Sequence, residues 1–236
     1  MLLAGLELTN GTWCQCPKEI CMNTKPPVNI ETVKVNIYGM RHGDKNGDAL
    51  TKEGREQVAM SCVKNFGGIP LHGYYSSLRK RGFETADLAM ANTRPAFHLM
   101  KIRRRAAFDY CLAPGITDTK AVTEGEKAYR KEHNIEKETI GTWGKGAPAW
   151  TDFLRGRVYQ GLKDVATEQA FDAEGNVTRN VFIGSHSPTI ELAVTDPNFP
   201  RLREADMVYY QFIAVKTNGE ITSVSLEAVS FIDRGF

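Results

Sequence analysis

The chain has 236 residues, of which 42% are hydrophobic and 25% are charged. That content is enough to bury one substantial core, and it excludes a disordered composition. Thirty Lys and Arg residues against 28 Asp and Glu residues give a formal net charge of +2. No overall field therefore attracts nucleic acid or an anionic membrane, and neither partner is expected.

The first part of the chain has no targeting pattern. Residues 1–7 have neither the basic leader nor the apolar length of a signal peptide, and no stretch reaches the roughly 18 apolar residues that span a bilayer. We therefore expect a cytoplasmic protein. Asn10-Gly11 and Pro26-Pro27 interrupt regular structure near the start. They predict an N-terminal extension or cap over 1–30, followed by one domain over 31–236.

The cysteines do not form a recognisable metal site. Cys14, Cys16 and Cys21 lie close together, but this spacing lacks a nearby fourth ligand and the paired arrangement of zinc sites. Reduced thiols are expected and no metal is predicted. A disulfide within this segment stays an alternative if the protein is exported.

The first half of the domain alternates between strand and helix patterns. β-Branched residues alternate with other residues over 33–38, which predicts a strand that ends just before Arg41-His42-Gly43. Thr51 is a suitable N-cap for a helix that runs to about residue 66. The pattern then predicts a strand over 73–77, a helix over 80–91 and a third strand over 106–110.

The second half continues this alternation. Helices are predicted over 124–133 and 147–168, the second with a buried side formed by Ala149, Phe153, Val158 and Leu162. Residues 180–184 form a nearly continuous apolar strand that ends before His186. Strands over 208–216 and 221–229 flank Asn218-Gly219, which is a strong hairpin signal.

This order of elements predicts an α/β fold, a three-layer α/β/α sandwich with a mostly parallel sheet and an antiparallel edge. Ligands of such sheets bind beyond the carboxyl ends of the strands. Arg41-His42, residues 79–81 and His186 all follow predicted strands. We therefore expect these side chains to meet at one edge of the sheet.

Arginine next to histidine suits phosphoryl transfer. A transferring phosphoryl group presents three anionic oxygens, which arginine binds through bidentate, charge-assisted hydrogen bonds. A neutral imidazole nitrogen attacks phosphorus near pH 7 and leaves again when water attacks the phosphoramidate. Arg41-His42 supplies both groups side by side.

Arg41-His42-Gly43 after a hydrophobic strand resembles the signature of the histidine phosphatase superfamily, which includes the phosphoglycerate mutases. Residues 50–57 resemble the family's Leu-Thr-x-x-Gly-x-x-Gln helix start, and residues 75–86 resemble its Ser-Ser-x-x-x-Arg-Ala-x-x-Thr-Ala block. Residues 181–187 resemble the strand before its second histidine. These ordered blocks cover most of the chain from about 33 to 190, so 31–236 is predicted to be the catalytic domain.

The resemblance implies that His42 is the nucleophile and that Arg41, Arg81 and His186 form the phosphate pocket, with His186 also counted as catalytic. The attacking nitrogen of His42 has to stay unprotonated. Its other nitrogen is therefore expected to donate to a fixed acceptor, a nearby backbone carbonyl as in the family.

Neighbouring candidates are assigned lesser roles. Arg81 precedes Thr85 by four residues, as the family arginine does, so Arg79 is interpreted as a solvated charge at the start of a helix. His72, His98 and His133 fit no motif and are expected to be structural.

The leaving group needs a proton, which the family supplies from a carboxylic acid. Asp109, at about the family's distance after Arg81, is the candidate, although the family more often has Glu there. Glu124 and Glu126 are the alternatives, although a carboxylate at a helix start is more commonly only a capping charge.

A phosphatase is the preferred function. The loop over 44–49 is short, like that of small phosphohistidine phosphatases, whereas mutases of the family have a longer loop. A phosphoglycerate mutase-type transferase and a non-catalytic protein that binds phosphorylated ligands stay as alternatives. Residues 141–147 are either a lid or a loop. The partner is expected to be a small phosphorylated substrate or a phosphoprotein, and no metal or other cofactor is required.

Two surface features are less specific. The basic run over 101–105 can extend the pocket toward an acidic substrate or bind nucleic acid, but a solvated turn beside a strand is preferred. The carboxyl-terminal hairpin has an exposed edge through which a homo-oligomer can form.

Overall fold

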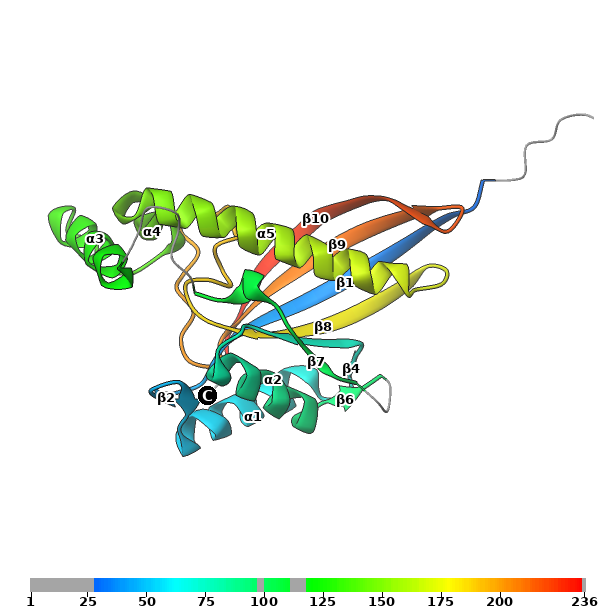
Figure 1. Cartoon of the computed structure of the whole chain (residues 1–236), viewed down its shortest axis with the longest axis horizontal. Helices are drawn as coiled ribbons and strands as arrows, with labels where there is room; N and C mark the ends of the chain where they lie inside the picture. Colours follow the sequence, from blue (N-terminus) through cyan, green and yellow to red (C-terminus); the bar gives the residue numbers. More distant parts are fainter. Residues whose placement is uncertain (1–27, 97–99, 111–117, 235–236) are drawn as a thin grey trace, which may run out of the picture.

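The computed structural model describes residues 28–96, 100–110 and 118–234, with a six-stranded sheet at the centre (Figure 1). The strand order is β10-β9-β1-β8-β5-β7. Its parallel strands are β1 (Ile30–Arg41), β8 (Val177–Ser185), β5 (Gly73–Ser76) and β7 (Ile102–Arg104). β9 (Met207–Thr217) pairs antiparallel with β1, and β10 (Glu220–Ile232) pairs antiparallel with β9. The sheet is therefore mostly parallel with an antiparallel edge, as predicted.

Helices cover both faces of this sheet. α1 (Lys52–Phe66) and α2 (Lys80–Asn92) lie on one face, and α5 (Pro148–Phe171) lies on the other (Figure 1). Successive side chains of β8 point to opposite faces, so Phe182 packs in the core beneath α1 and α2 while Val181 and Ile183 pack beneath α5. The predicted three-layer α/β/α sandwich is confirmed.

Local signals fix two of the predicted boundaries. The hydroxyl of Thr51 accepts a hydrogen bond from the Gly54 amide at 3.0 Å, so α1 begins where its N-cap predicts. Asn218 and Gly219 have φ angles of 53° and 87°. Two successive positive φ angles are what a type I′ turn requires, and the predicted hairpin is confirmed.

The third parallel strand lies elsewhere than predicted. The prediction of a strand over 106–110 is wrong, because Ala106–Phe108 forms a 3₁₀ helix and the strand is β7 within the basic run. Charged side chains suit an edge strand, where both faces reach solvent. Arg103 lies over the Tyr75 ring at 6.0 Å and Arg104 over the Phe83 ring at 4.5 Å. The interpretation of residues 101–105 as a solvated turn is therefore also wrong.

The region between β7 and β8 is more helical than predicted. α3 spans Thr119–Glu132, and most of residues 141–147 form α4 (Ile140–Gly146) instead of a loop. Thr139 and Thr142 form a reciprocal capping box at the start of α4. Trp143 is thereby held in the core with 2% of its surface exposed.

The buried side of α5 differs in part from the prediction. Val158 and Leu162 are buried as predicted, but Ala149 and Phe153 are exposed. Counting back from Val158 in steps of four residues reaches Leu154 and Trp150, which are fully buried. The pattern therefore begins one residue later than the sequence interpretation placed it.

Short strand pairs complete the fold. β2 (Lys45–Asn46) pairs with β3 (Ala49–Leu50), and β4 (Pro70–Leu71) pairs with β6 (Arg94–Pro95).

No helix within the described ranges is long and apolar enough to cross a bilayer. The cytoplasmic location and the homo-oligomer stay predictions.

Some predictions fall on residues outside the described ranges. They concern the first 27 residues of the predicted extension, including Cys14, Cys16 and Cys21, and His98. Cys62, which is described, is a buried free thiol, and burial raises its pKa to about 12. No cluster of three or more His, Cys, Asp or Glu side chains that can hold a metal ion occurs among the described residues.

Candidate active site

The predicted site residues meet at the carboxyl ends of three neighbouring parallel strands. β1 and β8 end in register, with Arg41 opposite Ser185, and the His42 amide donates to the Ser185 carbonyl at 3.1 Å. The Ser77 amide, just after β5, donates to the Gly184 carbonyl at 2.9 Å. These bonds bring the segments that follow β1, β5 and β8 to one point at the sheet edge, as the order of elements predicts.

His42 is buried and has a fixed tautomer. Its Nδ1 lies 2.7 Å from the Gly43 carbonyl oxygen. Because a carbonyl only accepts hydrogen bonds, Nδ1 carries the hydrogen and Nε2 of the neutral ring keeps its lone pair. Burial lowers the pKa of His42 from 6.5 to about 3; the bond to Gly43 opposes this effect, whereas His186 and Arg81 add to it. The ring is therefore neutral at pH 7 with an unprotonated Nε2.

Two glycines allow the close approach that holds this segment in place. A Cβ on Gly43 would lie 2.1 Å from the Gly54 carbonyl oxygen, and a Cβ on Gly54 would lie 2.0 Å from the Asp44 carbonyl oxygen. The backbone after His42 thus packs directly on the first turn of α1. This contact explains why the Arg-His-Gly and Leu-Thr-x-x-Gly patterns occur together.

His186 lies beside His42, with 5.3 Å between the ring centroids. Its Nδ1 accepts a hydrogen bond from Arg81 Nε at 3.3 Å. Nε2 therefore carries the hydrogen and donates to the Ser77 hydroxyl at 2.8 Å. Burial lowers the pKa of His186; Asp109 opposes this effect and Arg81 adds to it. Both imidazoles are thus held in defined tautomers by neighbouring groups.

Arg81 projects from the first turn of α2 toward the histidines, with 17% of its side chain exposed. Its Nη1 forms an ion pair with Asp48 Oδ1 at 3.0 Å. The other carboxylate oxygen of Asp48 accepts from the Lys80 amide at 3.1 Å. The guanidinium group of Arg81 is thus already paired with a carboxylate of the protein itself, that of Asp48.

Arg41 is held mostly by the segment before β9. Its Nη1 donates to the Leu202 carbonyl at 2.6 Å, and its Nη2 pairs with Glu204 at 2.8 Å. Its Nε is buried without a hydrogen-bond partner among the described residues. A buried donor without an acceptor is costly.

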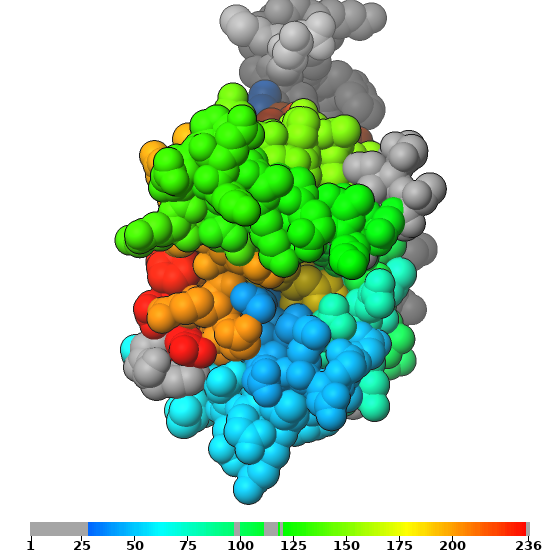
Figure 2. Space-filling view, turned by 90° about the vertical axis from the view of Figure 1, so that its left-hand side faces the viewer, coloured from blue at the N-terminus to red at the C-terminus, as the bar shows by residue number. Residues whose placement is uncertain are grey.

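The cavity between these groups has a volume of about 240 Å³. Figure 2 faces this end of the molecule, with α3 and α4 (green) above and the β2–β3 loop (blue) below. Both histidines and both arginines line the cavity together with Lys45, Tyr110, Thr123, Trp143, Ser187, Pro188 and Arg201. The four predicted pocket residues therefore surround one space large enough for a phosphoryl group.

Asp109 lies against His186 and outside the set of side chains that line the cavity. Its Oδ1 is 3.4 Å from His186 Nε2 and 3.5 Å from Arg79 Nε. Burial raises the pKa of Asp109, but His186 and Arg79 together outweigh burial, so the pKa lies below its ordinary value. Arg79 is the N-cap residue of α2 and is half exposed, in agreement with its interpretation as a charge at the start of a helix. It also contacts Asp109, the candidate general acid.

The alternative carboxylates do not contact the histidine pair. Glu126 is 1% exposed and accepts hydrogen bonds from Arg130 and Thr142, both at 2.7 Å, which ties α3 to α4. Glu124 is largely exposed and pairs with Lys127 at 3.5 Å. Of the three predicted carboxylates, Asp109 is the one nearest the site, and its role as general acid stays a prediction.

The sequence interpretation missed a second cationic wall of the cavity. Arg201 donates through Nε to Ser187 at 3.2 Å and through Nη1 to Glu138 at 2.8 Å. Glu138 also accepts from Trp143 Nε1 at 2.6 Å. Lys45 reaches the cavity from β2. No motif marks Arg201, because its position depends on a loop that only the folded chain brings to the site.

Comparison with solved structures identifies the fold. A phosphoglycerate mutase from Bacillus anthracis str. Sterne superposes with a TM-score of 0.54 at 17% identity, covering 84% of this chain and 93% of that chain. A phosphoserine phosphatase from Entamoeba histolytica superposes with a TM-score of 0.50 at 15% identity, covering 84% and 97%. The chain has the phosphoglycerate mutase-like fold.

The fold that the resemblance to the histidine phosphatase superfamily implies is thereby confirmed. A third structure, mycobacterial hydrolase 1, superposes with a TM-score of 0.50 at 15% identity and covers 85% of this chain and 98% of that chain. No protein-family model matches the sequence, and no curated protein matches it. The roles of the site residues therefore depend on the geometry of this chain.

Proposed function

We propose that the protein is a phosphatase that hydrolyses phosphomonoesters, or phosphohistidine, through a covalent phosphohistidine on His42. The observation that supports this most directly is the tautomer of His42, since the bond from Nδ1 to Gly43 leaves Nε2 with its lone pair in a cavity lined by cations. A nucleophile and fixed positive charges around one space are what phosphoryl transfer needs.

In the first step, the lone pair of His42 Nε2 attacks phosphorus opposite the leaving oxygen. The new P–N bond forms as the P–O bond to the leaving group breaks. Arg81 and Arg41, which both line the cavity, hold the phosphoryl oxygens and stabilise the charge that develops on them. To give a proton to the leaving oxygen, Asp109 has to be protonated and to turn from His186 toward the cavity. A substrate dianion nearby raises the pKa of Asp109 and so favours this protonated form.

In the second step, the carboxylate of Asp109 takes a proton from a water molecule that attacks phosphorus. The P–N bond breaks, its electron pair returns to His42 Nε2, and inorganic phosphate leaves. Asp109 is then protonated again for the next cycle. The lowered pKa of His42 keeps the released ring neutral and ready to react.

Hydrolysis is preferred to mutase-type transfer because of the loop after Gly43. Residues 44–49 include only the tight β2–β3 pair, with Gly47 at a φ angle of 61°. This loop contributes Lys45 to the side of the cavity. A mutase has to shield its phosphoenzyme from water, which such a short loop does little to achieve.

The test is phosphate release from an aryl phosphate. His42→Ala is expected to lower the rate on the order of 10⁴-fold, because the variant lacks the nucleophile. Labelling with a ³²P-phosphomonoester and an alkaline denaturing quench should leave label on the unmodified protein and not on the variant. His133→Ala, at an exposed position of α3's C-cap, is the matched control and should retain full activity.

Other outcomes separate the alternatives. Undiminished phosphate release by His42→Ala would refute the nucleophile. Isomerisation of a phosphoglycerate without net phosphate release would identify a mutase, and binding of phosphate esters without either reaction would identify a non-catalytic ligand-binding protein.

A further inference from the structure

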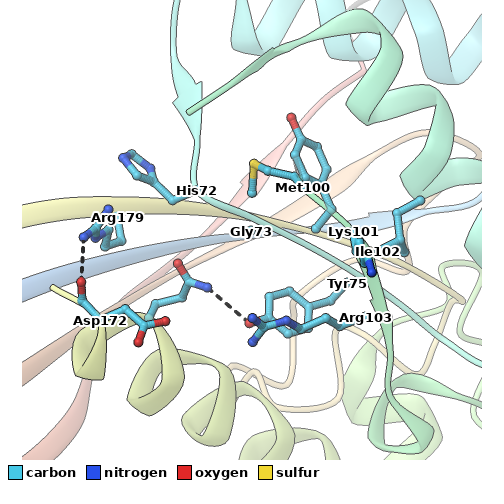
Figure 3. Close-up of a pocket in the computed structure, with 11 residues that line it drawn as sticks. His72, Gly73, Tyr75, Met100, Lys101, Ile102, Arg103, Asp172 and Arg179 are labelled. Atoms are coloured by element: carbon cyan, nitrogen blue, oxygen red, sulfur yellow. Dashed lines mark hydrogen bonds between the residues drawn. The ribbon is translucent and has the colours of Figure 1, made fainter. Parts of the chain in front are cut away.

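A larger cavity lies at the opposite end of the parallel strands. Its volume is about 610 Å³, and it is lined by residues from the beginnings of β5 and β7, from β8 and from the last turn of α5 (Figure 3). Gly73 begins β5 at this cavity, whereas Ser77, just beyond the other end of β5, contacts His186. The cavity is thus separate from the candidate active site.

The charge of this cavity is positive. Lys101, Arg103 and Arg179 line it, against the single carboxylate of Asp172. Lys101 is exposed and forms no ion pair among the described residues, while Arg103 shares Glu168 with Arg105. An excess of cations around one hollow attracts small anions.

Arg179 is held in position and keeps an unused donor. Its Nη2 donates to the Asp172 carbonyl at 3.1 Å, an interaction drawn in Figure 3. Its Nε is buried without a hydrogen-bond partner in the described part of the chain. A buried donor without a partner is costly, but this nitrogen is closed off from the cavity, so the part of the guanidinium group that lines the cavity has to bind a ligand. The bond to Asp172 therefore fixes the guanidinium group at the wall of the cavity.

The remaining walls of this cavity can pack against the non-ionic part of an organic ligand. In Figure 3, Met100 and Ile102 lie across the cavity from Arg179 and Asp172. Gln169 donates to the Tyr75 hydroxyl at 3.2 Å, and a Cβ on Gly73 would lie 2.9 Å from that amide nitrogen. The absence of a side chain at Gly73 thus leaves room for Gln169. A volume of this size matches sites for small organic ligands, which span roughly 300–1,000 Å³.

We propose that this cavity is a binding site for a small organic polyanion, one that carries phosphate or carboxylate groups on a compact apolar or ring-shaped body. Lys101 and Arg179, on opposite sides of the cavity, bind the anionic groups of the ligand. The wall that contains Met100 and Ile102 packs against its apolar or ring-shaped part. His72 also lines the cavity, and its Nδ1 accepts a hydrogen bond from the Asn180 amide at 3.1 Å, so the proton of its neutral ring is on Nε2. We propose binding at this site and no chemical step.

The test is calorimetric titration of the full chain with two probes, adenosine 5′-monophosphate for the phosphate source and citrate for the carboxylate source. His42→Ala serves as the background so that the nucleotide is not consumed. Lys101→Glu, added to this background, is expected to weaken binding of at least one probe by tenfold or more. Lys101 is exposed and makes no ion pair among the described residues, so this change breaks no ion pair there. Lys131→Glu, an exposed lysine in α3, is the matched control and should change affinity less than twofold.

Arg81→Ala on the same background separates the two cavities. Binding that depends on Lys101 and not on Arg81 supports the proposal whether or not His42 is a nucleophile. Binding that depends on Arg81 alone, or no binding of either probe at millimolar concentration, would overturn it. Activity of Lys101→Glu with otherwise unmodified sequence is expected to stay within twofold of the parent, which tests the proposed function separately.

Discussion

The two cavities at opposite ends of the parallel strands differ in how the backbone fixes a histidine. At the carboxyl ends, a carbonyl accepts from Nδ1 of His42, so Nε2 keeps its lone pair. At the amino ends, an amide donates to Nδ1 of His72, so Nε2 keeps the proton. One hydrogen bond of opposite sense thus separates a ring that can attack phosphorus from a ring that can only donate. Cations line both cavities, and the proposed nucleophile lies at the carboxyl ends of the strands.

The largest contrast is expected between the arginines of the two cavities. Arg81→Ala should lower kcat/KM for an aryl phosphate by about 10²- to 10³-fold, the effect of removing one fixed charge from a developing oxyanion. Arg179→Ala should leave kcat/KM within about twofold, because Arg179 lies at the other cavity. Steady-state kinetics of both variants provide the measurement. Equal losses would contradict the division between a reacting end and a binding end.

A smaller effect is expected at Asp109, and it depends on the leaving group. Asp109→Asn should slow hydrolysis of an alkyl phosphate by about 10²-fold, because the poor leaving group needs a proton. p-Nitrophenyl phosphate, whose leaving group needs little protonation, should be slowed less than tenfold. The comparison of the two substrates is the measurement, and a uniform loss would assign Asp109 to positioning His186 instead.

The smallest contrast is in stability against pH. The folded pKa of His42 is about 3 against 6.5 for an unperturbed ring, so the unfolded state binds more protons as pH falls below 6.5. The stability linked to this group is complete above that pH and is lost toward pH 3. Between pH 7 and pH 5 the loss is about 2 kcal/mol of unfolding free energy.

His42→Asn should remove this contribution in urea denaturation measured at both pH values. The same substitution at His72, which is only partly buried, should remove less of the pH dependence. An unchanged pH dependence in His42→Asn would show that the ring is not held neutral by burial.

The sequence predicts the segments of this fold that carry strong local signals. The alternation of residues 33–38, the Thr51 cap and the Asn218-Gly219 turn each predict an element that the structure contains. Local sequence patterns did not predict β7, because its charged residues have no strand signal of their own. Arg103 and Arg104 lie in a strand at the edge of the sheet, where their side chains stack on the rings of Tyr75 and Phe83. α4 contains three glycines, which by propensity favour a loop, and it is stabilised by its capping box.

The site residues also divide into those that the sequence predicts and those that depend on tertiary structure. His42, Arg81 and His186 were placed together from their positions after strands, since parallel strands bring their carboxyl ends to one edge. Arg201 and Lys45 were not found, because their places depend on loop paths that local patterns do not determine. The partner of Arg41 in Glu204 was missed for the same reason.

The ion pair between Arg81 and Asp48 makes substrate entry an exchange of anions. A phosphate group that takes Arg81 has to displace a carboxylate already seated there at 3.0 Å. That carboxylate also caps the Lys80 amide, so its departure uncovers the first turn of α2 just as a dianion arrives. For the proposed phosphatase, we expect singly charged ions to displace Asp48 less readily than a phosphate dianion does. We therefore expect the short loop after His42, through Asp48, to favour doubly charged anions over singly charged ones.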